Sequence, residues 1–165
     1  EALNIIGSPG THFAVTGLWY ALSAENQDSL NKNRAWTMMR ALSLNGAVTL
    51  ALKAARDNTT PNENRWGWPS GHTSSSFCVA AVLDEFYGPG VGIPAYVAAG
   101  AVGYRMYDTH DHWASDVVFG ATLGWIVGHT VAGQEKLEVA GFEVIPGVVS
   151  NGYDAGAGVM LIKRF

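Results

Sequence analysis

The sequence is poor in charged residues and in cysteine, and it contains no run of basic residues. Only 15% of the 165 residues are charged and 48% are hydrophobic, so the chain is too apolar to be disordered and long enough to bury one core. The net charge of −4 is a poor match to a nucleic-acid backbone, so we expect no nucleic-acid partner. The single cysteine, Cys78, excludes an intrachain disulfide and a zinc site built on several thiolates.

Two uncharged stretches have borderline length for a membrane span. Residues 87–104 and 117–134 contain no Lys, Arg, Asp or Glu, but the first holds two prolines and the second holds His129 and Gln134. Both patterns are also typical of buried helices, so we expect a soluble or peripherally membrane-associated domain. The chain begins at Glu1 without Met, which fits the removal of an N-terminal segment by processing or trimming.

The hydrophobic pattern predicts an all-α fold followed by a short extended segment. Apolar residues recur at helical spacing in five predicted helices: 11–24, 29–57, 70–86, 95–105 (after Pro94) and 114–131. The longest predicted loop runs from Asn58 to Pro69. After Gly141 the pattern predicts a hairpin with strands at 142–146 and 158–162 around a turn at 150–152. No linker divides the chain, so we expect one domain over residues 1–165, with a tail from about residue 141.

Polar residues gather near the end of the fourth predicted helix. Arg105 is the only Lys or Arg between Trp66 and Glu135, and a buried guanidinium needs an anion. Asp108, His110, Asp111, His112 and Asp116 follow it. His112 and Asp116 are spaced i, i+4, so in a helix starting near His112 the carboxylate would orient the imidazole as a nucleophile or base. Alternatively, the histidine caps the helix and the aspartate is a surface residue.

A second cluster, Pro69-Ser70-Gly71-His72, lies at the predicted start of a helix. Free backbone N–H groups, a hydroxyl and a glycine would bind phosphate-like oxygens there, with His72 as a proton donor. Equally, Ser70 caps the helix and His72 fills its first turn. Lys53 lies near the C-terminal end of the preceding predicted helix, where lysine is usually solvated and favourable to the helix dipole.

These three elements together resemble the tripartite signature of the type 2 phosphatidic acid phosphatase superfamily. The resemblance covers about residues 52–120, and the stretch from Trp113 to Ala121 is similar to the bacterial members. The superfamily also contains bacterial acid phosphatases and vanadium-dependent haloperoxidases. It implies an all-α bundle, here of about five helices, with the site between the helices.

The resemblance also implies residue roles. His112 would be the nucleophile that forms a phosphohistidine, Asp116 would orient it, and His72 would be the general acid. The phosphate oxygens would be held by Lys53, Ser70, Gly71 and Arg105. This two-step displacement needs no metal and no cofactor.

The first motif departs from the family pattern at one position. Where the family has an arginine before a proline, this sequence has Thr60 before Pro61, so one phosphate-binding cation is missing. Arg65 and Arg56 are close enough in sequence to replace it. We favour Arg65, because the loop that carries it precedes Pro69 and would fold back over the site.

The last motif is one residue longer than the family pattern. Six residues separate Arg105 from His112 where the family usually has five, which would put Asp111 at the nucleophile position. An aspartate cannot be the nucleophilic histidine, so we assign His112 from its spacing to Asp116. His110 is the less favoured candidate.

We therefore expect a phosphatase acting on a phosphomonoester or on a lipid or isoprenoid phosphate. The alternative is a catalytically weakened or inactive structural or binding protein that keeps the fold, which Thr60 and the longer last motif favour. A vanadate-dependent haloperoxidase fits less well, since such enzymes generally have longer chains and keep the arginine. The resemblance implies an extracytoplasmic location, periplasmic or membrane-associated, and a phosphate-bearing small molecule or lipid as partner.

Overall fold

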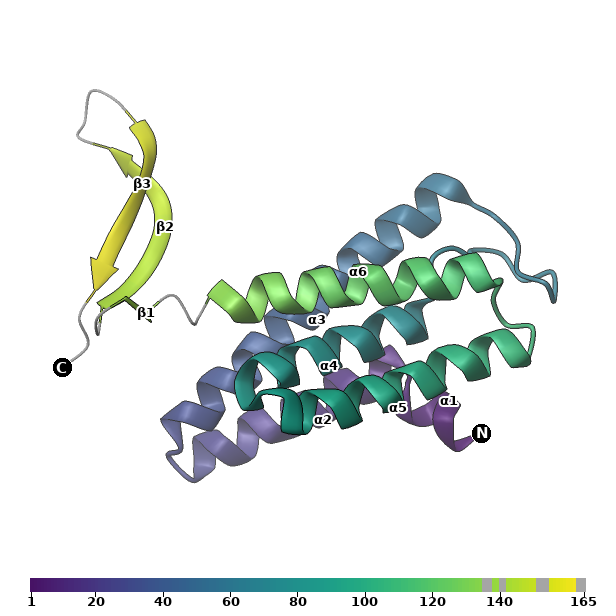
Figure 1. The fold of residues 1–165 in the computed structure, drawn as a ribbon, viewed down its shortest axis with the longest axis horizontal. Coiled ribbons are helices and arrows are strands. Elements are labelled where there is room, and N and C mark those ends of the chain that lie inside the picture. The colour runs from purple at the N-terminus through teal and green to yellow at the C-terminus, as the bar shows by residue number, and fades with distance from the viewer. Residues whose placement is uncertain (135–137, 140–141, 151–154, 163–165) are drawn as a thin grey trace. The chain divides into compact units, whose positions relative to one another are not determined.

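The computed structural model describes residues 1–134, 138–139, 142–150 and 155–162, in two units, Glu1–Ala132 and Gly133–Phe165. The described helices are α1 (Ala2–Ile6), α2 (Pro9–Glu25), α3 (Ser29–Arg56), α4 (Gly71–Tyr87), α5 (Pro89–Asp108) and α6 (Ala114–Gly133) (Figure 1). They confirm the prediction of an all-α bundle. The second unit contains three strands, β1 (Glu138–Val139), β2 (Phe142–Ser150) and β3 (Ala155–Ile162).

The strands form an antiparallel sheet in the order β1-β2-β3. In the β2–β3 pair, Pro146 lies opposite Val159 and Ser150 lies opposite Ala155. The predicted extended segments are confirmed, and both strands are longer than expected. Residues 151 and 152 of the predicted turn lie outside the described residues.

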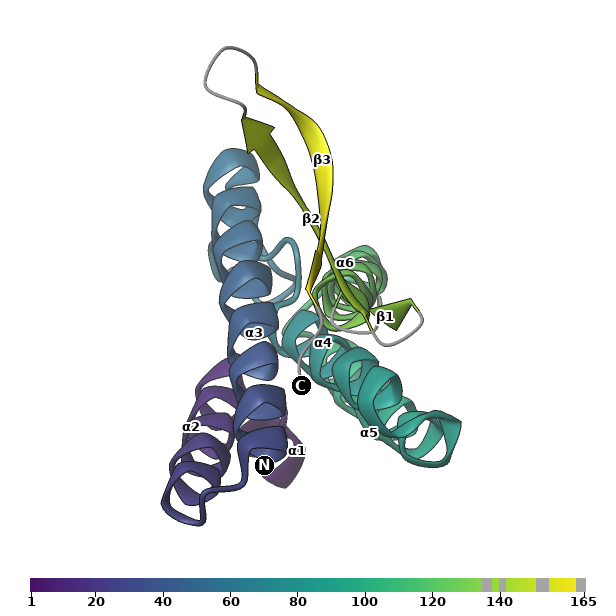
Figure 2. The same cartoon turned by 90° about the vertical axis from the view of Figure 1, so that its left-hand side faces the viewer.

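Helix α4 supplies the centre of the first unit. One hydrophobic cluster joins Cys78 and Val82 of α4 to side chains of α3 and α6, namely Met38, Ala41, Leu42, Val127, Val131 and Ala132. Helices α2 and α3 lie side by side in both views (Figures 1 and 2). Small polar residues also pack in the interior: the Ser74 hydroxyl accepts a hydrogen bond from Asn45 Nδ2 at 2.7 Å and lies 3.1 Å from the Thr49 hydroxyl.

Glycines on α6 allow it to approach the backbone of α4 closely. A Cβ atom at Gly124 would lie 2.0 Å from the backbone oxygen of Ser74, and one at Gly128 would lie 2.7 Å from that of Cys78. Side chains at these positions would push the helices apart. The close contact places the start of α6 beside the start of α4, where the Ser70 N–H donates to the backbone oxygen of Asp116 at 3.0 Å.

Two helix boundaries differ from the predictions. Helix α5 begins at Pro89 rather than after Pro94, because proline is favourable in the first turn, where its missing N–H costs nothing. Pro94 lies inside the helix, where it cannot donate the usual hydrogen bond to the carbonyl of Gly90. Both residues are exposed, so water can bind this carbonyl. Helix α1 was not expected, since five residues are too few to show a periodic pattern.

None of the described helices combines the length and the hydropathy that a membrane span requires.

Candidate active site

A cavity of about 300 Å³ lies where α3 ends, α4 begins and α5 ends, and we call it the site cavity. Four of the sequence-predicted residues line it: Lys53, Arg65, His72 and His112. The other lining residues are Asn4, Thr60, Asn64, Trp66, Met106 and Asp111. Residues more than 100 positions apart in the sequence therefore meet in one small polar space.

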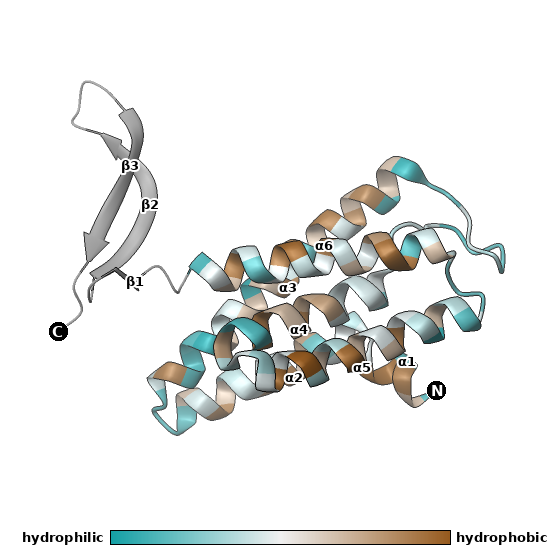
Figure 3. Ribbon diagram, viewed as in Figure 1, coloured by the Kyte–Doolittle hydropathy of each residue, from teal (hydrophilic) through white to brown (hydrophobic). Residues whose placement is uncertain are grey.

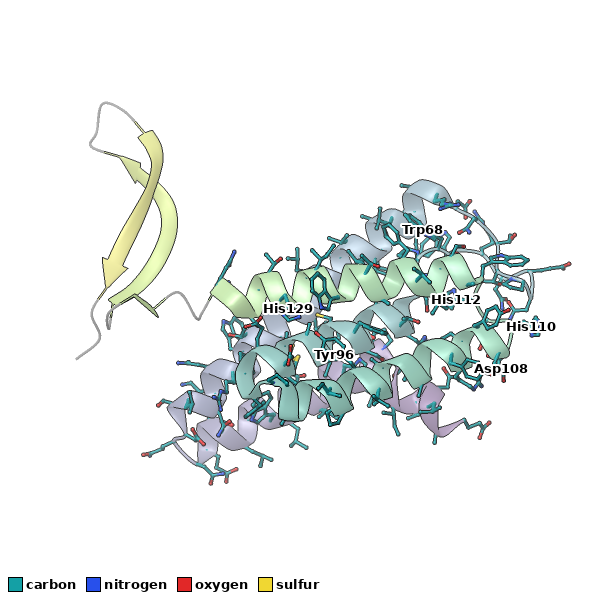
Figure 4. All side chains as sticks on the ribbon, in the orientation of Figure 1. Trp68, Tyr96, Asp108, His110, His112 and His129 are labelled. Atoms are coloured by element: carbon teal, nitrogen blue, oxygen red, sulfur yellow. The ribbon has the colours of Figure 1, made fainter. Side chains whose placement is uncertain are left out.

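His112 lies in the turn between α5 and α6, and its backbone N–H donates to the carbonyl of Met106 at 3.0 Å (Figure 4). Its Nδ1 atom is 3.6 Å from Oδ2 of Asp116, and the two side chains are only 11% and 1% exposed. The pairing was predicted, but its basis was wrong. Helix α6 begins at Ala114, so the two residues do not share a helix face. They meet because Asp116 accepts the Trp113 N–H at 3.0 Å and so caps the turn that carries His112.

The surroundings of His112 disfavour the charged form of its imidazole. Burial lowers its pKa, the nearby charge of Lys53 lowers it further, and the charge of Asp116 acts in the opposite direction. Its Nδ1 atom is buried and has no hydrogen-bond partner within 3.5 Å in the described part of the chain. A neutral imidazole has a free nitrogen lone pair, which is what a nucleophile needs.

His72 occupies the first turn of α4 and faces the same cavity. Burial lowers its pKa, and the charges of Lys53 and Arg105 act in the same direction. The carboxylate of Asp111 and the backbone of Asn4 oppose this effect. The acidic neighbour therefore helps His72 to keep a proton that it could donate.

Lys53 and Arg105 supply the positive charge. The ammonium group of Lys53, half-buried in the last turn of α3, donates to the backbone oxygen of Trp66, and burial lowers its pKa. Arg105 lies in the last turn of α5 and donates to the Thr109 hydroxyl. Its Nη1 is also 3.4 Å from Oδ2 of Asp111. Arg105 itself does not line the cavity; it contacts Asp111, which does.

Ser70 and Gly71 form the start of α4 without lining the cavity. The Ser70 side chain is fully buried, accepts the Thr73 N–H at 3.4 Å and accepts the Thr73 hydroxyl at 3.0 Å. Its hydroxyl therefore acts as the helix cap. The amide groups at the start of a helix lack intrahelical partners, so those of Gly71 and His72 are the donors that α4 offers here.

The side chain of Thr60 forms hydrogen bonds within its own loop. Its hydroxyl donates to the Asn62 side chain and accepts the Asn64 N–H at 3.0 Å, and the residue is 6% exposed. Arg65 does reach the cavity, but its side chain is 73% exposed and pairs with Asp57, which raises its pKa. Arg56 does not line the cavity and stacks 4.7 Å over the ring of Trp68.

His110 does not line the cavity. It is exposed, has a left-handed backbone conformation with φ of 61°, and lies at the outer turn in Figure 4. Among the described residues, the structure contains no group of three or more His, Cys, Asp or Glu that could hold a metal ion.

Two of the lining residues, Asn4 of α1 and Met106 of α5, were not identified by sequence reasoning. No spacing in the sequence connects them to the motifs. Asn64 and Trp66 belong to the loop that was expected to fold over the site. Asp111 was visible as the residue at the position where the family has its histidine, but its role beside Arg105 depends on the fold of the turn.

Comparison with known proteins identifies the family of the chain. The family profile described as the PAP2 superfamily matches residues 48–137. A protein named lipid A 1-phosphatase from Porphyromonas gingivalis is 36% identical over 75 residues, which are 44% of this chain and 16% of that protein. The chain therefore matches only a small part of that relative.

A solved structure has the same fold. The crystal structure of Aquifex aeolicus LpxE superposes with a TM-score of 0.67 at 20% identity, covering 79% of this chain and 81% of the other.

Proposed function

Because the chain belongs to the PAP2 superfamily, we propose that it is a phosphatase that hydrolyses a phosphate monoester through a phosphohistidine on His112. The observation that carries the proposal is the meeting of two histidines and a lysine, His112, His72 and Lys53, in one cavity. The family relation and the geometry support the same chemistry. A metal-bound water is not part of it.

In the first step, the lone pair on Nε2 of His112 attacks the phosphorus and displaces the alkoxide of the substrate, while Nδ1 keeps its proton on the side of Asp116. The buried carboxylate of Asp116, 3.6 Å from Nδ1, stabilises the positive charge that develops on the imidazole. His72 donates its proton to the leaving oxygen. In the second step, water attacks the phosphohistidine, His72 takes a proton from this water, and phosphate leaves.

Positive groups around the cavity stabilise the negative charge of the transferring phosphoryl group. Lys53 lines the cavity, and the amides of Gly71 and His72 lie at the positive end of α4. Arg105 would exchange its contact with Asp111 for a phosphate oxygen. Ser70 contributes by fixing the start of this helix through its cap.

The substrate that we propose is a lipid phosphate, with a phosphate on an extracytoplasmic lipid as the natural source. The relative from P. gingivalis carries the name of a lipid phosphatase. This proposal also places the protein outside the cytoplasm, at or near a membrane.

The competing proposal is a weakened or inactive protein that keeps the fold. It is favoured by Thr60, whose hydroxyl is used within the loop, and by the pairing of Arg65 with Asp57. In this case the cavity would bind phosphate without turning it over.

Phosphate release separates the two proposals. The full chain is incubated with p-nitrophenyl phosphate and with phosphatidic acid in mixed micelles, with and without EDTA. We expect release that EDTA does not affect and that vanadate inhibits, because vanadate mimics the five-coordinate phosphoryl group. Vanadate binding without any release would support the inactive protein, and loss of release in EDTA would contradict the histidine mechanism.

A further inference from the structure

A second cavity, of about 430 Å³, lies between α1, α2, α4 and α5, and we call it the apolar cavity. Most of its lining is hydrophobic, including Leu3, Ile6, Trp19, Val79, Leu83 and Val102. Strongly hydrophobic residues are visible on α1, α2 and α5 in Figure 3. Its volume is within the range of small-molecule sites, about 300–1,000 Å³.

The apolar cavity lies one helical turn from the site cavity along two helices, α4 and α5. On α4, His72 lines the site cavity and Ser76, one turn later, lines the apolar cavity. On α5, Met106 lines the site cavity and Val102, one turn earlier, lines the apolar cavity. One helical turn is about 5.4 Å, so a single elongated molecule could enter both spaces.

Two buried polar atoms lie near the junction of the cavities. Nδ1 of His12 and Oγ of Ser76 have no hydrogen-bond partner among the described residues, and both residues line the apolar cavity. Ser76 is one turn from His72. The pKa of His12 is lowered to about 4, first by burial and second by the nearby charge of His72. Buried polar groups normally have partners, so both atoms point to a ligand.

We propose that the apolar cavity binds an acyl chain of a lipid whose phosphate occupies the site cavity, and that His12 and Ser76 bind the polar linkage between them. The inference rests on the proposed phosphatase function and names the part of the substrate that the second cavity takes. The neutral His12 ring and the Ser76 hydroxyl each have a group to donate to an ester carbonyl or a glycerol oxygen. An acyl chain fits the remaining lining, which has almost no polar groups.

Proximity to the site cavity, one helical turn away on α4 and α5, favours this occupant over an unrelated apolar segment. A segment of protein in the apolar cavity would gain nothing from the phosphate site one turn away. A lipid phosphate would satisfy the cationic groups at one end, the two unpartnered polar atoms in the middle and the hydrophobic wall at the other end.

Phosphonates of different chain length test the inference without turnover, because their C–P bond is not hydrolysed. Binding of n-dodecylphosphonate and of ethylphosphonate to the full chain is measured by titration calorimetry below the micelle concentration. We expect the long chain to bind at least about a hundredfold more tightly, since each buried methylene adds to the affinity. Equal affinities would overturn the proposal, as would equal affinities for dodecanol and dodecylphosphonate, which would make the apolar cavity independent of the phosphate site.

A matched pair of α5 variants locates the chain. Ala98 and Ala101 are both exposed alanines of this helix, but only Ala98 lines the apolar cavity. We expect Ala98→Phe to reduce the chain-length preference at least about tenfold and Ala101→Phe to keep it. The same effect of both variants would overturn the proposal, because the chain would then bind elsewhere.

The polar linkage has its own test. The phosphonate analogue of lysophosphatidic acid, which is not hydrolysed, carries an ester carbonyl that its ether-linked counterpart lacks. We expect tighter binding of the ester form by about three- to tenfold, and Ser76→Ala should reduce this preference. No preference in the unmodified protein would contradict the role of His12 and Ser76. These binding results are separate from phosphate release, whose absence would overturn the proposed function instead.

Discussion

Two histidine–carboxylate pairs, His112 with Asp116 and His129 with Glu85, lie in different parts of the helical unit and differ in how fully the ring is bonded. His129 on α6 has its Nδ1 atom 2.7 Å from Oε1 of Glu85 and its Nε2 atom 2.9 Å from the Tyr96 hydroxyl (Figure 4). Both ring nitrogens are therefore bonded. His112 is more deeply buried, yet its Nδ1 atom is 3.6 Å from Asp116 and makes no hydrogen bond.

The difference distinguishes a histidine that joins three helices from one that lies at the site cavity. The Tyr96–His129–Glu85 group joins α4, α5 and α6, and His129 lines neither cavity described above. His112 faces a polar cavity that also contains His72 and Lys53. A histidine next to a carboxylate is thus a weak indicator of catalysis by itself. The position of the ring in the wall of the site cavity is the informative observation.

The largest effect should come from removing the ring of His112. We expect His112→Ala to abolish phosphate release from every substrate while the thermal unfolding transition is retained, because no other group can form the phosphohistidine. Steady-state assays and circular dichroism measure the two properties. His110→Ala is the control, and an inactive His110 variant beside an active His112 variant would show that the nucleophile is wrongly assigned.

Removing His72 should have the next largest effect, and its size should depend on the leaving group. We expect His72→Ala to slow hydrolysis of alkyl phosphates by about 10²–10⁴-fold, the usual contribution of a general acid. With p-nitrophenyl phosphate the loss of kcat/KM, which reports the first step, should be much smaller, since nitrophenolate leaves without a proton. The same loss with both substrates would contradict proton donation by His72.

We expect Arg65→Ala to weaken anion binding about tenfold if Arg65 replaces the missing arginine at Thr60. The measured quantity is the inhibition constant of vanadate or phosphate for Arg65→Ala. Arg56→Ala is the matched control, because Arg56 stacks on Trp68 outside the cavity. Equal inhibition constants for the two variants would mean that Arg65 does not replace the arginine missing at Thr60.

A smaller effect is expected on the pH profile when the charge of Asp111 is removed. Turnover needs protonated His72, so activity is lost as the pH rises through its pKa, which burial places below the ordinary value of about 6.5. Asp111 raises this pKa, whereas Lys53 and Arg105 lower it. Asp111→Asn should therefore move the alkaline limb of kcat/KM to lower pH. A limb that does not move would mean that His72 is not the group titrating there.

The smallest effect on activity is expected at His129. We expect His129→Ala to keep turnover within about twofold but to lower the free energy of unfolding by about 1–3 kcal/mol, because two hydrogen bonds are lost. Urea denaturation measures this loss. Tyr96→Phe removes only one of the bonds and should cost less. An inactive His129 variant of normal stability would remove the contrast between the two histidines.

Most helices of the bundle could be predicted from the sequence, because the long helices have periodic apolar residues and clear ends. Helix α3 ends one residue before the expected Asp57, and α4 begins at the predicted cap, Ser70. Helix α1 and the true start of α5 were not predicted. Their boundaries depend on tertiary contacts and on where proline is tolerated, which a periodic pattern does not record.

The site was predictable where a motif fixes the residue type, and not where a loop fixes the conformation. The motifs indicated Lys53, His72 and His112, which the fold brings to one cavity. The capping use of Ser70 was one of the two alternatives that the sequence offered, and it is the one the structure shows. The pairing of Arg65 with Asp57 and the contact of Asn4 with His72 depend on how the loop and α1 fold. Spacing along the chain contains no information about these two contacts.

The most direct measurement is to trap the phosphorylated protein. The full chain is mixed with substrate, quenched in alkali, which preserves phosphohistidine, and digested for mass spectrometry. We expect one phosphoryl group on the peptide that contains His112, absent from His112→Ala and enriched in His72→Ala when p-nitrophenyl phosphate is the substrate, because loss of the base slows the attack of water. Phosphate release with no trapped group, or a phosphoryl group on another residue, would contradict the phosphohistidine mechanism.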